Sequence, residues 1–191
     1  KFRKIVLLVL FGLFGICLNS IAQPGDPIDD LKTFCSQQKG FNLLGKFDVN
    51  WSNKGFTEKE FIVMQDLGFN FVRLPLDYRT YTLTNNWNYF VETQLAKIDQ
   101  VIEWGEEYNV HICINLHRAP GYCVNKTANL PSHQQLDLWI DTVAQNAFAN
   151  HWNMFAERYK DISAERLSFN LVNEPHDVEE EVYVGVMNKA I

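Results

Sequence analysis

The stretch that decides the fold is Leu167 to His176, which reads LSFNLVNEPH. From Leu167 to Leu171 a large apolar residue stands at every second position, which is typical of a short strand whose two faces have different surroundings. Asn173 and Glu174 come next, and Pro175 then ends the strand because it has no backbone N–H for a central ladder. The pattern predicts a strand with an amide and a carboxyl group at its C-terminal end, where parallel α/β folds keep their active sites.

Three further strands are predicted upstream of this one, and helical patterns alternate with them. Thr57-Glu58-Lys59-Glu60 forms a capping box at the start of one helix, which stops at Gly68. The predicted strands are Gly40–Gly45, a buried apolar run between glycines, Phe69–Leu76 and Val110–His117. The predicted helices are Leu31–Gln38, Thr57–Leu67, Val91–Asn109, a long helix capped by Ser132 that continues to Tyr159, and a last helix capped near Asp177.

Strands that alternate with amphipathic helices imply a parallel sheet with right-handed crossovers. A doubly wound nucleotide-binding sheet would have a glycine-rich phosphate turn after its first strand, and Gly45-Lys46-Phe47-Asp48 is not one. A (β/α)8 barrel needs about 250 residues, so this chain supplies about four of its eight strand–helix units. We therefore predict an α/β protein in which residues 39–191 form the N-terminal half of a TIM barrel.

The first residues have the order of a secretory signal peptide. Lys1, Arg3 and Lys4 precede an apolar run from Ile5 to Cys17, and small residues up to Ala22 follow it. A membrane anchor is the alternative, but roughly 14 apolar residues are fewer than the ~20 that span a bilayer. We expect residues 1–22 to be a signal peptide, residues 23–38 to be a linker with a short helix, and the protein to be secreted, either extracellular or periplasmic.

Charge and cysteine content exclude several kinds of protein. Removal of the leader would take away three basic residues and change the net charge from −6 to about −9. Such an acidic protein lacks the clustered Lys and Arg that nucleic acid requires, and after cleavage it would have no membrane contact. Cys35, Cys113 and Cys123 form no Cys-x-x-Cys pair, so neither a zinc site nor a disulfide framework is indicated, although one bridge stays open.

Polar residues lie at the ends of all four predicted strands. In a parallel barrel these ends meet on one face, so residues far apart in the sequence become neighbours. They are Asn42, Arg73, His117, Asn173 and Glu174, and the loops add exposed aromatic residues, Trp51, Trp87 and Tyr122. Singly, each polar residue has an ordinary structural explanation, such as a surface ion pair for Arg73. Together, a carboxyl group, a fixed cation, an imidazole and an amide beside aromatic faces suit a neutral polyhydroxylated ligand.

Four motifs give the sequence a specific resemblance to a known family. They are KGFNLLG at 39–45, GFNFVRLP at 68–75, NLHRAPG at 115–121 and LVNEPH at 171–176. In this order and spacing they resemble the motifs around the first four barrel strands of glycoside hydrolase family 5, the cellulase family. The resemblance covers nearly all of the chain after the leader. It implies a (β/α)8 barrel that hydrolyses β-linked polysaccharides with retention of configuration.

The resemblance also implies a role for each matching residue. Glu174 would be the acid/base that protonates the leaving oxygen and later activates water. Asn173 would hydrogen-bond the sugar hydroxyl beside the reacting carbon, Arg73 would support the nucleophile, and His117 would line the subsite where the bond is cut. Trp51 is expected to bind the substrate through its ring. No metal or organic cofactor is implied, and the expected partner is a β-glucan or a related polysaccharide.

The nucleophile of the family, a Glu at the end of the seventh strand, has no counterpart in these residues. Asp77 is a weak substitute, because it more simply caps the turn after its strand. We therefore expect residues 1–191 to be inactive alone and to be part of a β-glycanase, with endo-β-1,4-glucanase favoured over β-mannanase and other β-glucanases. Two alternatives stay open: a non-catalytic sugar-binding half barrel, and another retaining barrel hydrolase of the same clan that also places Asn-Glu after its fourth strand.

Overall fold

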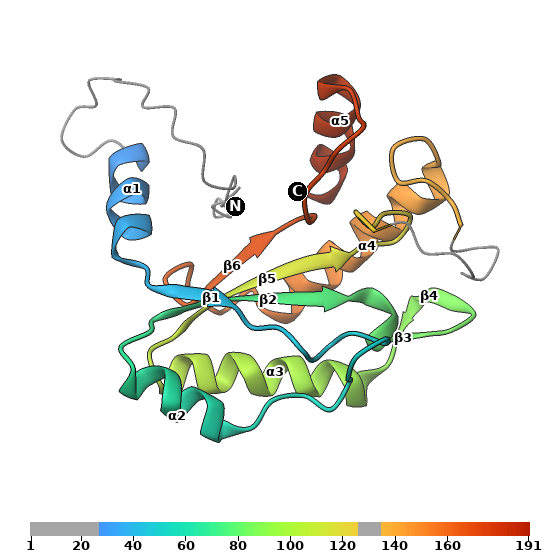
Figure 1. The fold of residues 1–191 in the computed structure, drawn as a ribbon. Helices are drawn as coiled ribbons and strands as arrows, with labels where there is room; N and C mark the ends of the chain where they lie inside the picture. Colours follow the sequence, from blue (N-terminus) through green and yellow to red (C-terminus); the bar gives the residue numbers. More distant parts are fainter. Residues whose placement is uncertain (1–26, 126–134) are drawn as a thin grey trace.

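The computed structural model describes residues 27–125 and 135–191, and its centre is a sheet of four parallel strands (Figure 1). Neighbouring strands in this sheet are paired in the order β1-β2-β5-β6, which is also their order along the chain. Because all four strands are parallel, their C-terminal ends lie at the same edge of the sheet. The strands are β1 Gly40–Asn42, β2 Phe71–Asp77, β5 His111–Arg118 and β6 Leu167–Asn170.

Helices alternate with these strands along the chain. In Figure 1, α2 and α3 lie along one face of the sheet, and α1 stands where the strands begin. Phe34 of α1 packs edge-on against His111 at the start of β5, with ring centroids 5.3 Å apart, so this helix covers the N-terminal end of the sheet. The helices are α1 Pro27–Gln37, α2 Glu58–Asp66, α3 Glu92–Glu107, α4 Thr142–Arg158 and α5 Glu180–Ala190.

Apolar and polar side chains alternate along the strands, so the two faces of the sheet differ. Each buried aliphatic side chain of the apolar face stabilises the fold by about 1.5–3 kcal/mol, because its surface leaves water. On β2 and β5 this face consists of side chains that are at most 1% exposed: Val72, Leu74, Leu76, Ile112, Ile114 and Leu116. The alternate positions place Arg73, Asn115 and Asn170 on the opposite face. That opposite face is the one that a closed barrel would enclose.

The sequence signals at both ends of α2 are confirmed. A carboxylate oxygen of Glu60 accepts a hydrogen bond from the backbone N–H of Thr57 at 2.6 Å, as a capping box requires. Gly68 follows the helix with a φ of +75°, a left-handed conformation that glycine adopts without strain. Local chemistry therefore sets where this helix begins and ends.

The prediction of a buried strand at Gly40–Gly45 is wrong in length and in burial. β1 spans only Gly40–Asn42, and all three residues are exposed, with Phe41 41% exposed. The reason is its position, because β1 is an edge strand and β2 is its only partner strand among the described residues. An apolar run between glycines indicates a strand, but it does not report how that strand is covered.

The long helix predicted from Ser132 is wrong at its start. Ser132 itself lies outside the described residues, and α4 begins at Thr142 after the cap residue Asp141. Upstream, the Asp137 carboxylate accepts a hydrogen bond from the Trp139 backbone, and the Asp141 carboxylate accepts one from the Asp137 backbone. Aspartate side chains that bond nearby backbone N–H groups favour turns over helix, so turns precede α4.

The sequence patterns do not predict the antiparallel hairpin of β3 (Thr82–Leu83) and β4 (Asn86–Phe90) that follows β2. Trp87 on this hairpin is only 4% exposed, which contradicts the expected exposed loop aromatic. Its carbonyl oxygen accepts a hydrogen bond from Nε2 of His151 on α4 at 2.7 Å, and the Tyr81 hydroxyl donates to Nδ1 at 2.9 Å. Burial lowers the pKa of His151 to about 4, so the ring is neutral.

The remaining predicted elements are confirmed with small shifts at their ends. For example, α1 begins at Pro27 rather than at Leu31, whereas α5 starts after the cap residue Glu179. The expected signal peptide, residues 1–22, lies outside the described residues and stays a prediction. Within residues 27–125 and 135–191, no helix is both long enough and apolar enough to cross a membrane. The three cysteines of the described chain are free thiols: Cys35, Cys113 and Cys123.

Candidate active site at the strand ends

The guanidinium group of Arg73, the third residue of β2, joins side chains from β1, from β6 and from the segment just after β6. Its Nη1 donates to Asn42 Oδ1 at 2.9 Å, which joins β2 to the edge strand β1. Its Nε and Nη2 donate to Asn170 Oδ1 at 3.1 and 2.9 Å, and Nη2 also donates to Asn173 Oδ1 at 2.7 Å. These acceptors are neutral amides rather than the acid of a surface ion pair. The positive charge is therefore fixed in position without being neutralised by these bonds.

Asn170 is a member of this cluster that sequence reasoning misses. Its Oδ1 accepts hydrogen bonds from Arg73 and, at 2.8 Å, from Nδ2 of Asn115, its partner across β5 and β6. The signal that points to it is the spacing of Ser168 and Asn170, two polar residues that share one face of a strand because they are two positions apart. Two polar residues at this spacing indicate that this face of the strand does not belong to the apolar core.

Asn173 is almost fully buried, at 2% exposed, just beyond the end of β6. Its backbone N–H donates to the carbonyl of Leu116 at 3.1 Å, so the pairing with β5 continues past the strand. Arg73 occupies Oδ1, whereas the buried Nδ2 has no hydrogen-bond partner among the described residues. A buried amide left unpaired costs about 1–3 kcal/mol, so a ligand hydroxyl that accepts this hydrogen bond would recover that cost.

His117 stands near the end of β5 and is half-buried. Its Nδ1 is also buried and unpaired within the described part of the chain. Burial is the largest cause that lowers the pKa of His117, and the charge of Arg73 lowers it further, whereas Glu174 and Asp48 act in the opposite direction. The ring is therefore neutral at pH 7, with one nitrogen that donates and one that accepts, which suits a sugar hydroxyl.

Glu174 follows Asn173 and presents an exposed side chain at the same edge. Its carboxylate lies close enough to Arg73 and His117 to affect both groups electrostatically, so the structure brings these three predicted residues together. The backbone of Glu174 has a φ of +44°, in the left-handed region. For a residue with a side chain this conformation costs about 1–3 kcal/mol, and such strain is concentrated at functional sites.

Asp77 is committed to a structural role, as its predicted cap requires. It is 3% exposed and its carboxylate accepts hydrogen bonds from the backbone of Arg79 at 3.0 Å and from that residue's guanidinium at 2.5 Å. Nε of Arg118 lies 3.5 Å from the same carboxylate. The carboxylate thus caps the 3-10 helix η1, Tyr78–Thr80, and is bound by two cations.

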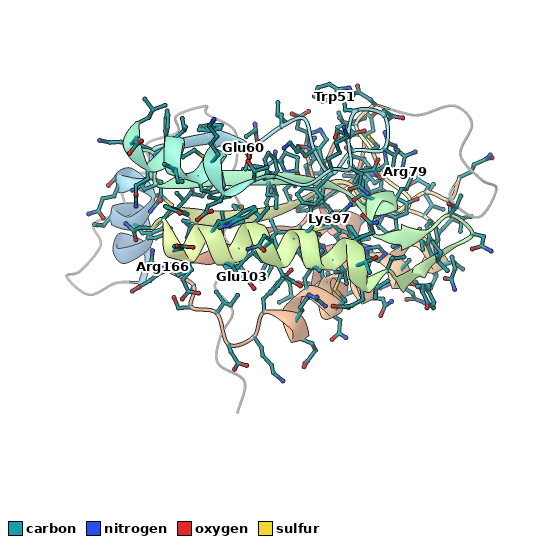
Figure 2. All side chains as sticks on the ribbon, turned by 90° about the horizontal axis from the view of Figure 1, so that it is seen from below. Trp51, Glu60, Arg79, Lys97, Glu103 and Arg166 are labelled. Carbon is teal, nitrogen blue, oxygen red and sulfur yellow. The ribbon has the colours of Figure 1, made fainter. Side chains whose placement is uncertain are left out.

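Trp51 lies on the loop after β1 and is 71% exposed. Figure 2 shows it at the outer surface, toward the end that carries Arg79 and away from Arg166. The loop is folded back on itself, because the backbone of Asp48 pairs with that of Ser52. Asp48 acts electrostatically on His117, which places this loop near the strand ends. Trp51 therefore offers an exposed aromatic face on a loop near the strand ends.

A model of the cellulase family, glycosyl hydrolase family 5, matches residues 25–191. The chain belongs to glycosyl hydrolase family 5. This membership confirms the resemblance carried by the four strand-end motifs, and the matched range includes every residue of the cluster from Asn42 to Glu174. The (β/α)8 prediction is also confirmed, because the solved family 5 relatives are TIM barrels and the described strands and helices correspond to a part of one.

Several family 5 relatives show how far the similarity extends. Endoglucanase C of Acetivibrio thermocellus is 32% identical over 118 residues, which cover 62% of this chain and 32% of that protein. The glucan 1,3-beta-glucosidase of Candida oleophila is 30% identical over 109 residues, covering 57% of this chain and 25% of that protein. A crystal structure of a glycoside hydrolase matches with a TM-score of 0.69 and 32% identity, covering 81% of this chain and 48% of its own. The chain thus spans about half the length of that structure and a third or less of these two curated relatives.

Proposed function

We propose that the protein is a secreted, retaining glycoside hydrolase that cleaves a β-linked glucan, with endo-β-1,4-glucanase as the favoured activity. The observation that carries this proposal is the exposed carboxyl group of Glu174 beside the amide-bound cation Arg73, in a chain of family 5. Retaining glycoside hydrolysis needs a proton donor at the leaving oxygen and a second carboxylate, whose charge a fixed cation can stabilise. The chemistry proposed for this site uses neither a metal ion nor an organic cofactor.

Glu174 would act first as an acid and then as a base. In the first step its carboxyl group gives a proton to the glycosidic oxygen while a carboxylate nucleophile attacks the anomeric carbon and the glycosidic C–O bond breaks. In the second step the Glu174 carboxylate takes a proton from water, whose oxygen displaces the nucleophile from the sugar. The configuration is retained because two inversions follow one another, and both carboxyl groups return to their first state.

The neighbouring polar groups would hold the sugar at the cleaved bond. The unpaired Nδ2 of Asn173 would donate to the hydroxyl beside the reacting carbon, and the neutral ring of His117 would bond a second hydroxyl. Both interactions satisfy buried atoms that have no partner in the described chain, so they add binding energy that water-exposed groups would not. The exposed ring of Trp51 would stack on a sugar face farther along the chain of the polysaccharide.

The nucleophile is proposed to be a glutamate from sequence outside residues 1–191. Asp77 does not fit this role, because it is buried and bound by Arg79 and Arg118. A retaining enzyme needs its two carboxyl groups about 5–5.5 Å apart, so the nucleophile would lie beside both Glu174 and Arg73. The guanidinium, whose hydrogen bonds go to neutral amides, has charge left to stabilise that carboxylate.

The names of similar proteins point to two different glucan linkages. One similar protein is named an endoglucanase and another a glucan 1,3-beta-glucosidase, at 32% and 30% identity. Both names support a β-glucan over a β-mannan as the substrate. We favour the β-1,4 linkage because the family model carries the name cellulase. A sugar-binding protein without hydrolysis is the alternative from another functional class.

The experiment is hydrolysis by the protein expressed with the natural sequence on both sides of residues 27–191. We expect wild type to release reducing ends from β-1,4-glucan more rapidly than from β-1,3-glucan or β-mannan, and NMR to show retained configuration in the first product. Glu174→Gln should abolish this activity, whereas Glu181→Gln, an exposed glutamate on α5, should not change it. Binding of glucan without hydrolysis would establish the sugar-binding alternative, and an inverted product would refute the retaining mechanism.

Secretion has a separate test. Residues 1–22 carry the leader pattern, so the mature protein recovered from the medium or the periplasm should begin at Gln23. Mass spectrometry of the N-terminal peptide measures this directly. Protein that stays inside the cell with Lys1 to Lys4 still attached would contradict the proposed export.

A further inference from the structure

The unusual backbone conformation of Glu174 must be held by contacts with other residues. Its φ of +44° is unfavourable for a glutamate, and the strand that precedes it ends four residues earlier, at Asn170. A strained backbone persists only where surrounding groups hold it in place. The side chain is exposed and cannot supply that hold through packing, so the hold must come through the main chain.

The hydroxyl of Tyr122 supplies a direct hold on this main chain. It donates a hydrogen bond to the backbone carbonyl of Glu174 at 2.6 Å. One residue earlier, the backbone N–H of Asn173 donates to Leu116 of β5 at 3.1 Å. The peptide segment that carries the acid is therefore fixed at two successive points, once by β5 itself and once by the loop that follows β5.

A tight turn fixes the position of Tyr122 in its own loop. Residues 119–122 form a four-residue turn in which the Tyr122 and Ala119 backbones exchange hydrogen bonds of 3.0 and 2.9 Å. Pro120 at the second position and Gly121 with a φ of +76° at the third are the residues that a type II turn requires. The carbonyl of Gly121 also accepts a hydrogen bond from the backbone of Leu138 at 3.0 Å, which anchors the turn ahead of α4.

The ring of Tyr122 packs against two aromatic neighbours. It packs edge-on against Trp139, with centroids 5.1 Å apart, and against His176 at 5.9 Å. Burial raises the pKa of Tyr122 to about 12, although an interaction with the His176 backbone acts in the opposite direction. The hydroxyl therefore keeps its proton at neutral pH and stays a hydrogen-bond donor.

We propose that Tyr122 is a positioning residue for the acid/base: its hydroxyl holds the Glu174 backbone in the left-handed conformation from which the carboxyl group reaches the scissile oxygen. This inference rests on the proposed function, because it assigns Tyr122 a part in the proton-transfer step. The positioning role depends on the hydroxyl of Tyr122, whereas a stacking role in sugar binding would need only the ring. The two roles therefore predict different effects for Tyr122→Phe.

The experiment compares Tyr122→Phe with wild type on two aryl β-cellobiosides, in the protein expressed with its natural flanking sequence. Phenyl β-cellobioside has a poor leaving group and needs a proton from Glu174, whereas 2,4-dinitrophenyl β-cellobioside needs almost none. Because a small displacement of a catalytic group costs up to about 100-fold, we expect kcat/KM for the phenyl substrate to fall roughly 10- to 100-fold. The dinitrophenyl substrate should change less than about 2-fold at the glycosylation step.

Tyr108→Phe is the matched control, because it also removes one tyrosine hydroxyl that donates a 2.6 Å hydrogen bond, in this case to Glu58 on α2. It should leave both substrates unchanged. An equal loss on both substrates, or no loss on either, in Tyr122→Phe would refute the positioning role.

Inactivity of wild type on every glucan and glycoside would instead refute the proposed function. The positioning role is then decided by a crystal structure of Tyr122→Phe. A Glu174 backbone that leaves the positive-φ region supports the hold by the hydroxyl, and an unchanged backbone overturns it.

Discussion

Arg73 and Glu174 belong to the same cluster of side chains, but the structure holds them in opposite ways. The guanidinium of Arg73 uses three of its nitrogen atoms to bond amide oxygens from three asparagines, and its pKa is lowered mainly by burial. Glu174 has an exposed side chain, and its strained main chain is bonded by the Tyr122 hydroxyl. One residue is fixed through its side chain and the other through its backbone.

This difference matches what each residue would do in glycoside hydrolysis. A charge that stabilises a carboxylate works best when it does not move, because reorganisation would cost energy during the reaction. A group that gives a proton to one oxygen and later takes a proton from water must leave its carboxyl free while its point of attachment stays in place. The comparison therefore predicts that Arg73 contributes to stability and to activity, whereas Glu174 contributes to activity alone.

Loss of the proposed acid/base, Glu174, should give the largest effect on activity. Glu174→Ala is expected to lower turnover of polysaccharide by about 10²- to 10⁴-fold, the usual range for general acid–base catalysis. Because the side chain is exposed, the free energy of unfolding should change by less than about 0.5 kcal/mol. Steady-state kinetics and urea denaturation measure the two quantities. A large loss of stability in this variant would contradict the prediction that Glu174 contributes to activity alone.

Loss of the fixed cation should lower stability by the next largest amount. Arg73→Met leaves the side-chain oxygens of Asn42, Asn170 and Asn173 without their shared donor, so the free energy of unfolding should fall by about 2–4 kcal/mol. Arg73→Lys keeps the charge but cannot reach all three acceptors at once, and it should recover only part of the loss. Equal stability of wild type and Arg73→Met in urea would mean that these hydrogen bonds add nothing to the fold.

Two glycines with the same backbone conformation test how the acid's main chain is held. Gly121 and Gly68 have φ values of +76° and +75°, but a Cβ at Gly121 would lie 2.7 Å from Ala144 and 2.8 Å from the Leu138 backbone, whereas nothing lies within 4 Å at Gly68. Gly68→Ala should therefore cost about 1 kcal/mol, and Gly121→Ala should cost about 2 kcal/mol or more. Thermal unfolding of the two variants and of wild type measures these losses of stability.

The catalytic activities of the same two variants give a second test. Gly121→Ala displaces the turn that carries Tyr122, so it should lower turnover, whereas Gly68→Ala lies after α2 and should leave turnover unchanged once both proteins are folded. Equal kinetics in the two variants would contradict a role of this turn in placing the acid.

The smallest expected effect concerns the strain at Glu174 itself. Glu174→Gly relieves the left-handed conformation, and Glu174→Ala does not, although both remove the carboxyl group. The glycine variant should be more stable than the alanine variant by about 0.5–1 kcal/mol after the greater freedom of glycine in the unfolded chain is counted. Chemical denaturation of the two inactive proteins measures this difference. A less stable glycine variant would show that the backbone at this position is not strained.

Much of the site could be predicted because parallel strands bring their ends together. Arg73 and His117 lie within recognisable strand patterns, and Asn173 and Glu174 follow one. The parallel topology therefore makes these residues neighbours. Local signals were equally informative for α2, whose start at Thr57 follows from short-range hydrogen bonding. These are cases in which a few adjacent residues contain all the information that the structure uses.

The parts that could not be predicted depend on distant contacts. The Tyr122 hydroxyl acts on a residue 52 positions away, so in the sequence it is only one more loop aromatic. Trp87 was expected to be exposed because the Asn-rich hairpin around it has a weak strand pattern, and its burial depends on α4. The left-handed conformation of Glu174 has no local signal either, since glycine or asparagine would be the usual residue there.

The contact between the hairpin and α4 also contributes to how the stability of the protein depends on pH. His151, which bonds the hairpin from α4, has a pKa of about 4 in the fold, whereas a histidine in an unfolded chain titrates near 6.5. Between these two values the unfolded chain takes up a proton that the folded chain does not, so stability is complete above about pH 6.5 and declines as the pH falls toward 4. The same buried ring that fixes the hairpin therefore makes the fold less stable on acidification.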